Sequence, residues 1–317
     1  MKIGTIASHS ALNIISGAKA EGFDTRLYCL PNRLQFYRSF GLDDSIVEIE
    51  SFDEILNMDL SKVVLIPHGS FVAQIGAKKI LESGLKMFGS KEILKWEEDR
   101  ELKTKLLKEA GFAVPREFLD FEGIDCPVIA KTNGAAGGDG YFIAKSASEI
   151  EKMMNPDLQY TFQEFIVGTK VFVTYFQSMA KERTEVFGAD VRYETDADSS
   201  LRFNDRPSFV VVGNLPLVLR ESILAKYYDM GVAFVHAFHR LTHQNLVGPF
   251  CIETVIDKNK QIYSFEFSGR IVAGTNVWIP SSPYSYVQFG EPIWMGRRIA
   301  IEIRELVEQG RLDQALR

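Results

Sequence analysis

The first ninety residues alternate between short apolar runs and amphipathic segments, and this alternation limits the possible folds more than any other feature of the chain. Apolar runs typical of buried strands occur at residues 3–7, 26–30 and 63–67, with helical periodicity between and after them. Strands that alternate with helices usually pair in parallel, and the helices cover the faces of the sheet. We therefore predict that residues 1–90 form a Rossmann-like parallel α/β domain.

Polar residues follow two of these predicted strands. The first strand runs into Ser8-His9-Ser10, and the third runs into His68-Gly69-Ser70. The carboxyl ends of parallel strands meet at one rim of the sheet, where the amino ends of the following helices attract anions. Ser10 or Ser70 alone would be interpreted as a helix N-cap. Two such turns at one rim favour a phosphate-binding site.

Residues 91–317 lack the strict alternation and are expected to form a second domain of the α+β class. A strongly charged helical segment at 91–110 comes first, and its charges are interpreted mostly as a solvated face. Long helical segments follow at 221–241 and 291–309, with most of the predicted strands before the first of them.

The predicted strand at 127–131 ends in a lysine, and a glycine-rich loop follows it. Lys131 ends this strand, and four glycines lie between Gly134 and Gly140. Glycine lets backbone N–H groups approach phosphate oxygens closely, so we predict a loop that covers phosphate groups, with a tight hairpin as the alternative. The pattern is neither a P-loop nor a dinucleotide-binding fingerprint, because it lacks Gly-Lys-Ser/Thr and a strand follows it.

A further strand at 160–166 runs into a turn at Val167-Gly168. The backbone of such a hinge strand can hydrogen-bond to an adenine ring, and the carboxylate of Glu164 is placed to act near a ribose.

Two glutamates, Glu253 and Glu266, stand thirteen residues apart on the two strands of a predicted β-hairpin. An even number of loop residues places both carboxylates on one face of the hairpin, opposite or diagonal to each other. Alternation then adds Ser264, Ser268 and Arg270 to that face, and it places Phe265, Phe267 and Ile271 on the other.

Carboxylates, a hydroxyl and a guanidinium on one side of a hairpin form a poor wall for an apolar core. They suit a divalent cation that bridges phosphate oxygens, because Mg²⁺ is commonly held by one or two carboxylates together with substrate phosphates. An exposed sheet face with a salt bridge explains the spacing alone equally well.

Three histidines, His236, His239 and His243, have the spacing of one face of a helix. A metal site is one interpretation of this face. The neighbouring residues Phe234 and Phe238 are aromatic, and cysteines or carboxylates that would complete a metal site are not close in the sequence. We therefore expect a structural role for the histidines.

The bulk properties argue against several classes of protein. A net charge of −6 is unlike the basic surface of a nucleic-acid-binding protein. No apolar run reaches the roughly 18 residues of a membrane span, and no signal peptide is evident before the first strand. Cys29, Cys126 and Cys251 lack the spacing of a metal site and are interpreted as buried thiols, so we expect a cytoplasmic protein.

The order of a lysine strand, a glycine loop, a hinge strand and two late carboxylates with an arginine is that of the ATP-grasp superfamily. More specifically, the chain resembles the archaeal FAICAR synthetase (PurP) family over nearly its whole length. The segments that carry this resemblance are residues 7–12, 67–72, 210–214, 248–254, 270–276 and 282–286.

The resemblance implies both a fold and an activity. Members of the family use ATP to join formate to the amine of AICAR, an aminoimidazole ribonucleotide of purine (IMP) biosynthesis, through formyl phosphate. An ATP-grasp domain would span residues 91–317, with a nucleotide-loop subdomain at 112–167 and a metal-binding catalytic subdomain at 168–317. The family also suggests a homo-oligomer.

The resemblance further implies roles for individual residues. The residues are His9, Ser70 and Asn214 for AICAR; Glu253 and Glu266 for Mg²⁺ or Mn²⁺; Lys131 and Arg270 for catalysis; and Lys131, Gly137, Gly138, Gln163, Glu164, Phe165, Val167 and Glu194 for ATP.

Two departures from the family pattern leave other functions open. The resemblance implies basic residues at two positions of the glycine loop where this chain has Ala136 and Asp139, and each lost charge-assisted bond to a phosphate would cost about 1.5–3 kcal/mol. The loop at 196–205 is also shorter than the family pattern. The alternatives are an ATP-grasp ligase for another carboxylate and amine, and a weakly active or non-catalytic paralogue that binds purine nucleotides.

Overall fold

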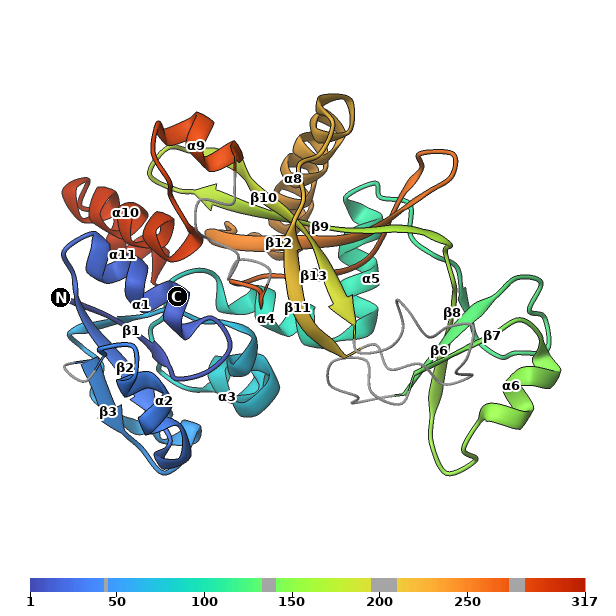
Figure 1. The fold of residues 1–317 in the computed structure, drawn as a ribbon, viewed down its shortest axis with the longest axis horizontal. Helices are drawn as coiled ribbons and strands as arrows, with labels where there is room; N and C mark the ends of the chain where they lie inside the picture. The colour runs from blue at the N-terminus through green and yellow to red at the C-terminus, as the bar shows by residue number, and fades with distance from the viewer. Residues whose placement is uncertain (43–44, 133–140, 195–209, 274–282, 317) are drawn as a thin grey trace.

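The computed structural model describes residues 1–42, 45–132, 141–194, 210–273 and 283–316. The described strands form three sheets that follow one another along the longest axis of the molecule (Figure 1). The N-terminal sheet lies at one end, a five-stranded central sheet lies in the middle, and a second four-stranded sheet lies at the other end.

The N-terminal sheet is parallel, as predicted. Its strands are β1 (Lys2–Ile6), β2 (Asp24–Cys29), β3 (Ile46–Glu48) and β4 (Val63–Leu65). They lie in the order β3-β2-β1-β4, and every neighbouring pair is parallel. The carboxyl ends of β1 and β4 therefore meet at the same rim.

A helix from the end of the chain packs on this N-terminal domain (Figure 1). α10 (Met295–Glu308) lies against α1 (Ala11–Ala20), where a Cβ atom on Gly17 would come within 2.1 Å of the backbone nitrogen of Arg297. Only glycine allows two helix backbones to approach this closely. The close approach fixes the C-terminal helix against the first helix of the chain.

The central sheet is antiparallel and has one apolar face. Its strands are β9 (Gly168–Ser178), β10 (Arg183–Glu194), β11 (Val211–Pro216), β12 (Gly248–Asp257) and β13 (Ile262–Ser268), in the order β11-β10-β9-β12-β13. The long helix α8 (Glu221–Thr242) covers one face, where buried Phe234 and Phe238 join the main core. Phe234 stacks on Phe250 of β12 and contacts Phe267 of β13.

The third sheet has a small core of its own. Its strands are β5 (Glu117–Phe118), β6 (Val128–Thr132), β7 (Phe142–Ala144) and β8 (Tyr160–Glu164), in the antiparallel order β5-β8-β6-β7. α6 (Ala147–Met153) supplies the buried Ile150, which packs with Val128 and Phe162 of the sheet.

Two helical segments are each broken in the middle. The segment at 91–110 forms α4 (Lys91–Glu98) and α5 (Arg100–Glu109), because Asp99 is extended and its carboxylate accepts the Leu102 N–H that begins the second helix. The segment at 71–83 forms a π-helical turn, η4 (Phe71–Ile75), and α3 (Ala77–Glu82), separated by Gly76 with a φ of 92°. The first break directs α5 along the central sheet.

The other described helices are short. None of the helices in the described ranges combines the length and apolar character needed to cross a membrane. The short helices not yet named are η1 (Pro31–Arg33), α2 (Leu34–Arg38), η3 (Phe52–Asn57), α9 (Pro283–Phe289) and α11 (Leu312–Ala315).

The three histidines at 236, 239 and 243 are exposed near the C-terminal end of α8. The Nδ1 atom of His239 lies 3.3 Å from the Gln244 carbonyl oxygen, and His243 ends the helix with a φ of 57°. Over the described part of the chain, no group of three or more His, Cys, Asp and Glu side chains is arranged to hold a metal ion.

Candidate active site

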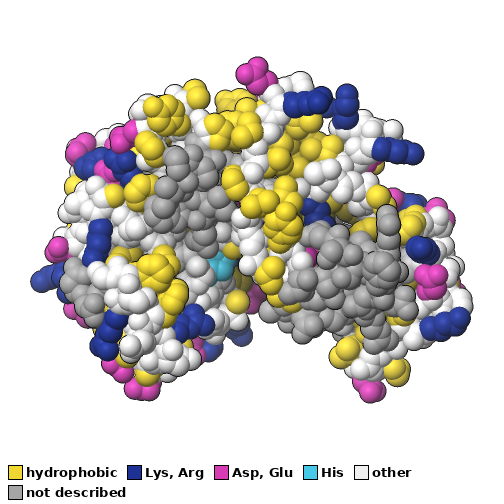
Figure 2. All heavy atoms as spheres, in the orientation of Figure 1, with side chains coloured by type: hydrophobic (Ala, Val, Ile, Leu, Met, Phe, Trp, Pro, Cys, Tyr) yellow, Lys and Arg dark blue, Asp and Glu magenta, His cyan; other side chains and the backbone are white. Residues whose placement is uncertain are grey.

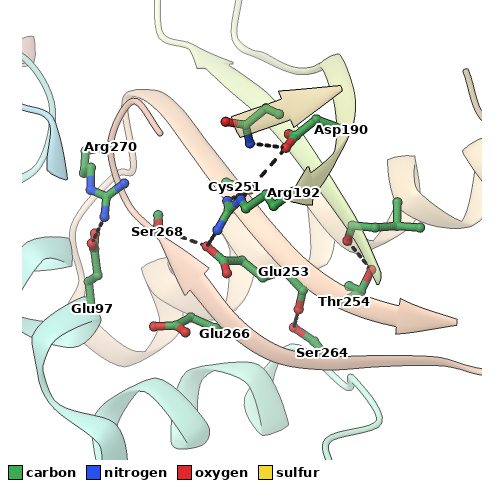
Figure 3. Close-up of polar contacts among 12 residues, drawn as sticks. Glu97, Asp190, Arg192, Cys251, Glu253, Thr254, Ser264, Glu266, Ser268 and Arg270 are labelled. Atoms are coloured by element: carbon green, nitrogen blue, oxygen red, sulfur yellow. Dashed lines mark hydrogen bonds and ion pairs between the residues drawn. The ribbon is translucent and has the colours of Figure 1, made fainter. Parts of the chain in front are cut away.

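The face of the central sheet opposite α8 is polar (Figure 3). Asp190 and Glu253 both pair with Phe172, and Arg192 pairs with Asn214. Cross-strand partners point to the same face of a sheet, so these five residues share one face. The Arg192 guanidinium lies 3.8 Å from the centre of the Phe172 ring. The positively charged guanidinium of Arg192 is therefore held in place among the carboxylates of this face.

The glutamate hairpin has the predicted pairing. Glu253 of β12 lies directly opposite Glu266 of β13, on the polar face (Figure 3). A β-bulge beside this pair shifts the register. The predicted alternation is therefore wrong at two positions: Ser264 pairs with Thr254 on the α8 side, and Phe265 packs into the small cluster on the polar side.

Glu266 is the more open of the two carboxylates. Its side chain is 42% exposed, and its Oε1 atom lies 2.6 Å from the Nζ atom of Lys103 on α5. Burial raises the pKa of Glu266, but the charge and hydrogen bond of Lys103, with the charges of Lys131 and Arg192, lower the pKa to about 2. Glu266 is therefore ionised at neutral pH.

Glu253 is the buried partner. Its Oε1 atom accepts a hydrogen bond from Nη1 of Arg192 at 3.0 Å and another from the Ser268 hydroxyl at 3.4 Å. Burial raises the pKa of Glu253 against the attraction of Arg192, and the negative charge of Glu266 adds to the rise. An additional cation between the two glutamates would favour the ionised form of Glu253.

The donor set of the hairpin fits a divalent cation. Glu253 and Glu266 offer carboxylate oxygens from directly opposed positions, and oxygen is the ligand that Mg²⁺ and Mn²⁺ prefer. The exposure of Glu266 leaves room for phosphate oxygens or water to complete the coordination. These two residues could therefore hold the metal that the sequence predicts.

The two polar turns of the N-terminal domain meet at one rim, as predicted. The Ser70 hydroxyl donates to the Ser8 oxygen at 2.8 Å, and the rings of His9 and His68 stack with their centres 5.4 Å apart. Neither Ser10 nor Ser70 caps a helix with its side chain. Both serines therefore stand at N-cap positions, as the alternative predicts, but their hydroxyls bond across and within the rim instead of capping the helices.

The rim histidines are neutral. Desolvation, followed by the positive charge of Arg270, lowers the pKa of His9 far below its ordinary value, although part of its side chain is exposed, and burial lowers the pKa of His68 to about 3. His9 also has a φ of 46°, a conformation that costs free energy in a residue other than glycine. A Cβ atom on Gly69 would lie 2.8 Å from Nε2 of His9, which explains the glycine there.

The chain after β13 joins the rim to the hairpin. Ile271 forms a parallel bridge with His68. Arg270 therefore stands at the junction, and its Nη2 atom donates to Oε1 of Glu97 on α4 at 2.6 Å (Figure 3). The bridge brings the rim beside the hairpin, although the two are distant in the sequence.

Asn214 is held by a buried carboxylate. Its Nδ2 atom donates to Oδ2 of Asp190 at 2.8 Å, and Asp190 is 2% exposed. Burial raises the pKa of Asp190 to about 6, against the charge of Arg192 and the hydrogen bond from Asn214. An ionised carboxylate only accepts hydrogen bonds, so the amide oxygen of Asn214 faces away from Asp190.

Lys131 and the hinge strand lie together on the third sheet. The Lys131 ammonium donates to Oε1 of Gln163 at 2.7 Å, and burial lowers the pKa of Lys131 while Glu266 opposes the change. Glu164 accepts a hydrogen bond from Nε of Arg116 at 3.2 Å. The structure therefore brings Lys131 and Gln163 into contact and leaves Glu164 in an ion pair.

The other predicted nucleotide contacts are spread around these strands. Glu194, at the end of β10, forms an ion pair with Lys170 of β9. The Phe165 N–H is used by the Pro127 oxygen, and the Val167 side chain is exposed. Gly137 and Gly138, together with Ala136 and Asp139, lie outside the described residues.

Sequence reasoning missed four charged residues of the site: Glu97, Lys103, Asp190 and Arg192. A signal for two of them is present, because Asp190, Arg192 and Glu194 alternate along one strand and must share a face. Lys103 and Glu97 are hidden among the many charges of the segment at 91–110. Only the packing of α4 and α5 against the hairpin distinguishes them from solvated residues.

Two family descriptions match the chain. One described as "Domain of unknown function (DUF1297)" matches residues 144–316, and one described as "Protein of unknown function (DUF1246)" matches residues 3–118. Relatives named 5-formaminoimidazole-4-carboxamide-1-(beta)-D-ribofuranosyl 5'-monophosphate synthetase are 45% identical in Ignicoccus hospitalis and 40% identical in Sulfolobus acidocaldarius. These alignments cover 100% and 98% of this chain, and 96% and 97% of the relatives. The chain belongs to the FAICAR synthetase family.

Solved structures agree with this assignment to the FAICAR synthetase family. An IMP biosynthesis protein PurP from Thermococcus kodakaraensis is 34% identical with a TM-score of 0.84, and the match covers 99% of this chain and 100% of that one. An N5-carboxyaminoimidazole ribonucleotide synthetase from Thermotoga maritima has a TM-score of 0.64 at 17% identity, covering 96% of this chain and 76% of that one. The predicted ATP-grasp fold, with its N-terminal parallel α/β part, is confirmed.

Proposed function

We propose that this member of the FAICAR synthetase family is an ATP- and formate-dependent ligase that forms FAICAR from AICAR in IMP biosynthesis. The observation that carries the proposal is the bridge between Ile271 and His68, which brings the rim of His9 and Ser70 to the hairpin that bears Glu266. A ligase must hold its acceptor beside its phosphoryl donor, because proximity supplies much of the rate of such a reaction.

His9, Ser70 and Asn214 would bind AICAR. The rim lies where helix α1 follows β1, a position that favours the phosphate group of a nucleotide. The amide oxygen of Asn214, turned away from Asp190, would accept a hydrogen bond from an N–H group of the substrate. The neutral ring of His9 has one donor and one acceptor nitrogen, and its Nδ1 atom lies 2.6 Å from the Ser10 hydroxyl oxygen, which orients the ring at the rim.

ATP would lie between the third sheet and the hairpin. The electrostatic attraction between Lys131 of that sheet and Glu266 of the hairpin supports a site shared by both. The proposed ATP contacts are Lys131, Gly137, Gly138, Gln163, Glu164, Phe165, Val167 and Glu194.

Glu253 and Glu266 would hold Mg²⁺ or Mn²⁺, which when bound supplies positive charge to the transferring phosphoryl group. Lys131 would reach the same phosphates from the third sheet. Arg270, fixed by Glu97 at the junction, would stabilise negative charge between the phosphates and the rim.

In the proposed reaction, an oxygen of formate attacks the γ-phosphorus of ATP, and the bond from that phosphorus to the ADP oxygen breaks. The product is formyl phosphate. The amine nitrogen of AICAR then attacks the formyl carbon, the carbon–oxygen bond to phosphate breaks, and the amine loses a proton. The roles of Arg270 and Lys131 are to hold the anions in line and to offset their charge.

A direct test measures ADP release by the purified protein with ATP, Mg²⁺, formate and AICAR. We expect release that depends on both formate and AICAR, with FAICAR as the product. Release that depends on a different acid or amine would show the alternative ligase. Nucleotide binding without any ADP release would show a non-catalytic paralogue.

The binding of AICAR is expected to weaken as the pH falls through about 6, the pKa of buried Asp190. The sign follows from the raised pKa: above it the ionised carboxylate fixes the Asn214 amide, and below it a protonated carboxyl can donate to the Asn214 oxygen instead. Of the charges that face Asp190, Arg192 lowers its pKa and Glu253 raises it.

The matched variant for this pH dependence is Asp190→Asn. We expect its KM for AICAR to rise about tenfold at pH 7.5, which corresponds to the loss of one hydrogen bond to a charged group. In this variant the KM for AICAR should no longer change as the pH passes through about 6. The KM for ATP serves as the internal control. The same pH profile in the variant and the wild type would refute a role for Asp190.

We further propose a cytoplasmic homo-oligomer. β11 is the edge strand of the central sheet, and its exposed residues include Val212 and Leu215, with Val218 just beyond. Figure 2 shows apolar side chains gathered along the middle of this face of the molecule. An edge strand with exposed apolar residues is typical of an interface, and light scattering of the purified protein would test it.

A further inference from the structure

Lys103 differs from the other lysines of α5 because its side chain is nearly buried beside the glutamate hairpin. Among the lysines of α5, Lys105 and Lys108 are exposed, whereas the Lys103 side chain is 14% exposed and points to the hairpin. Its Nζ atom lies 2.6 Å from Oε1 of Glu266. Glu97 and Glu253 also act on Lys103 electrostatically, so the ammonium stands in the negative field of the proposed metal site.

The ion pair cannot stay unchanged when a divalent cation binds Glu266. An ammonium and a divalent cation on the same carboxylate repel each other strongly at this range. Lysine has a flexible stem and three N–H donors. Phosphate oxygens bridged by the metal would be the nearest new anions for Lys103.

The other cations of the site are already engaged in the described structure. Lys131 donates to Gln163, and Arg270 donates to Glu97. Between Asn133 and Gly140 the sequence offers no lysine or arginine, and it adds the negative charge of Asp139. A triphosphate bound here would be stabilised by a further cation in addition to Lys131 and Arg270, and α5 places Lys103 beside the hairpin.

We propose that Lys103 is a phosphate-binding residue of the ATP site: it holds Glu266 while the site is empty of metal and passes to the terminal phosphates of the nucleotide when the metal is bound. The proposal deepens the proposed function, since it depends on ATP binding between the third sheet and the hairpin. It does not depend on formate or AICAR. The competing explanation is that Lys103 only neutralises Glu266.

The two explanations predict the same Mn²⁺ binding but different nucleotide binding in the variant Lys103→Met, because a lysine that only neutralises Glu266 is not needed for nucleotide affinity. Removing the competing ammonium should leave Mn²⁺ binding alone, measured by electron paramagnetic resonance, equal or tighter in both cases. If Lys103 binds phosphate, the affinity for the Mg²⁺ complex of a non-hydrolysable ATP analogue, measured by calorimetry, should fall about 10- to 100-fold. The affinity for AMP should stay the same.

Two further variants serve as controls. Lys103→Arg keeps a cation and should recover part of the affinity for the analogue, whereas Lys105→Met on the exposed side of α5 should match the wild type. Thermal unfolding confirms that each variant is folded. An unchanged affinity of Lys103→Met for the analogue overturns the proposal, as does an equal loss for AMP.

The same experiment separates this proposal from the proposed function. Wild-type protein that binds the analogue but shows no formate-dependent ADP release would refute the ligase activity. A selective loss of analogue binding in Lys103→Met would still support the phosphate role in that case. Wild-type protein that does not bind the analogue would overturn both.

Discussion

Replacement of Glu266 by glutamine is expected to lower the rate of formate-dependent ADP release by about 1,000-fold. A metal that stabilises the transferring phosphoryl group contributes several kcal/mol, and each loss of about 1.4 kcal/mol is tenfold in rate. Glu266 offers the open carboxylate of the opposed pair, with 42% of its side chain exposed. The amide oxygen of glutamine lacks the charge that a divalent cation requires.

The measurement has two parts, because lost activity alone does not identify a metal ligand. Mn²⁺ affinity should fall at least about tenfold in Glu266→Gln, and the rate should recover partly at high Mg²⁺ concentration. Glu101→Gln, on an exposed position of α5, is the control and should behave as wild type. Normal Mn²⁺ affinity in Glu266→Gln would contradict the assignment of the metal site to this hairpin.

Replacement of Arg298 by methionine is expected to lower the free energy of unfolding by about 3–5 kcal/mol. Arg298 of α10 is fully buried, and its guanidinium pairs with Glu185 at 2.8 Å and with Glu302 at 3.0 Å. Methionine fills much of the space but removes the cation that two buried carboxylates share, so Glu302 loses its ion pair with Arg298 and Glu185 keeps only its pair with Arg183. This loss exceeds what packing alone would cause.

The control for this prediction lies on the same helix. Arg304 pairs with Glu21 at 2.6 Å, but its side chain is 44% exposed, so Arg304→Met should cost only about 0–1 kcal/mol. Urea denaturation of both variants gives the two values. Equal stabilities for the two variants would show that the buried network does not hold α10 in place.

The N-terminal sheet and the glutamate pair could be predicted because their signals are local. Alternating apolar runs predicted parallel strands, and β1, β2 and β4 are parallel neighbours in the structure. The spacing of Glu253 and Glu266 predicted a shared face, which their direct pairing confirms. For the sheet, the patterns of short segments contain the information, whereas the direct pairing of the glutamates also depends on the bulge beside them.

The predictions were wrong or incomplete where contacts between segments distant in the sequence determine the position of a residue. A single extra residue in the bulge moved Phe265 to the polar face, and no feature of the hairpin sequence marks the bulge. Lys103 resembles every other charge of its helix until α5 is placed against β13. Asp190 contacts Asn214 only because β10 and β11 pair in one particular register.

In the proposed reaction, formate is activated by ATP at the hairpin and delivered to an amine at the rim. The most direct measurement uses formate labelled with ¹⁸O, with ATP, Mg²⁺ and AICAR, and follows the label in inorganic phosphate by mass spectrometry. Attack of formate on the γ-phosphorus, followed by breakage of the carbon–oxygen bond, leaves one formate oxygen in each phosphate released. We therefore expect one ¹⁸O atom in phosphate for each FAICAR formed, and unlabelled phosphate would contradict the account.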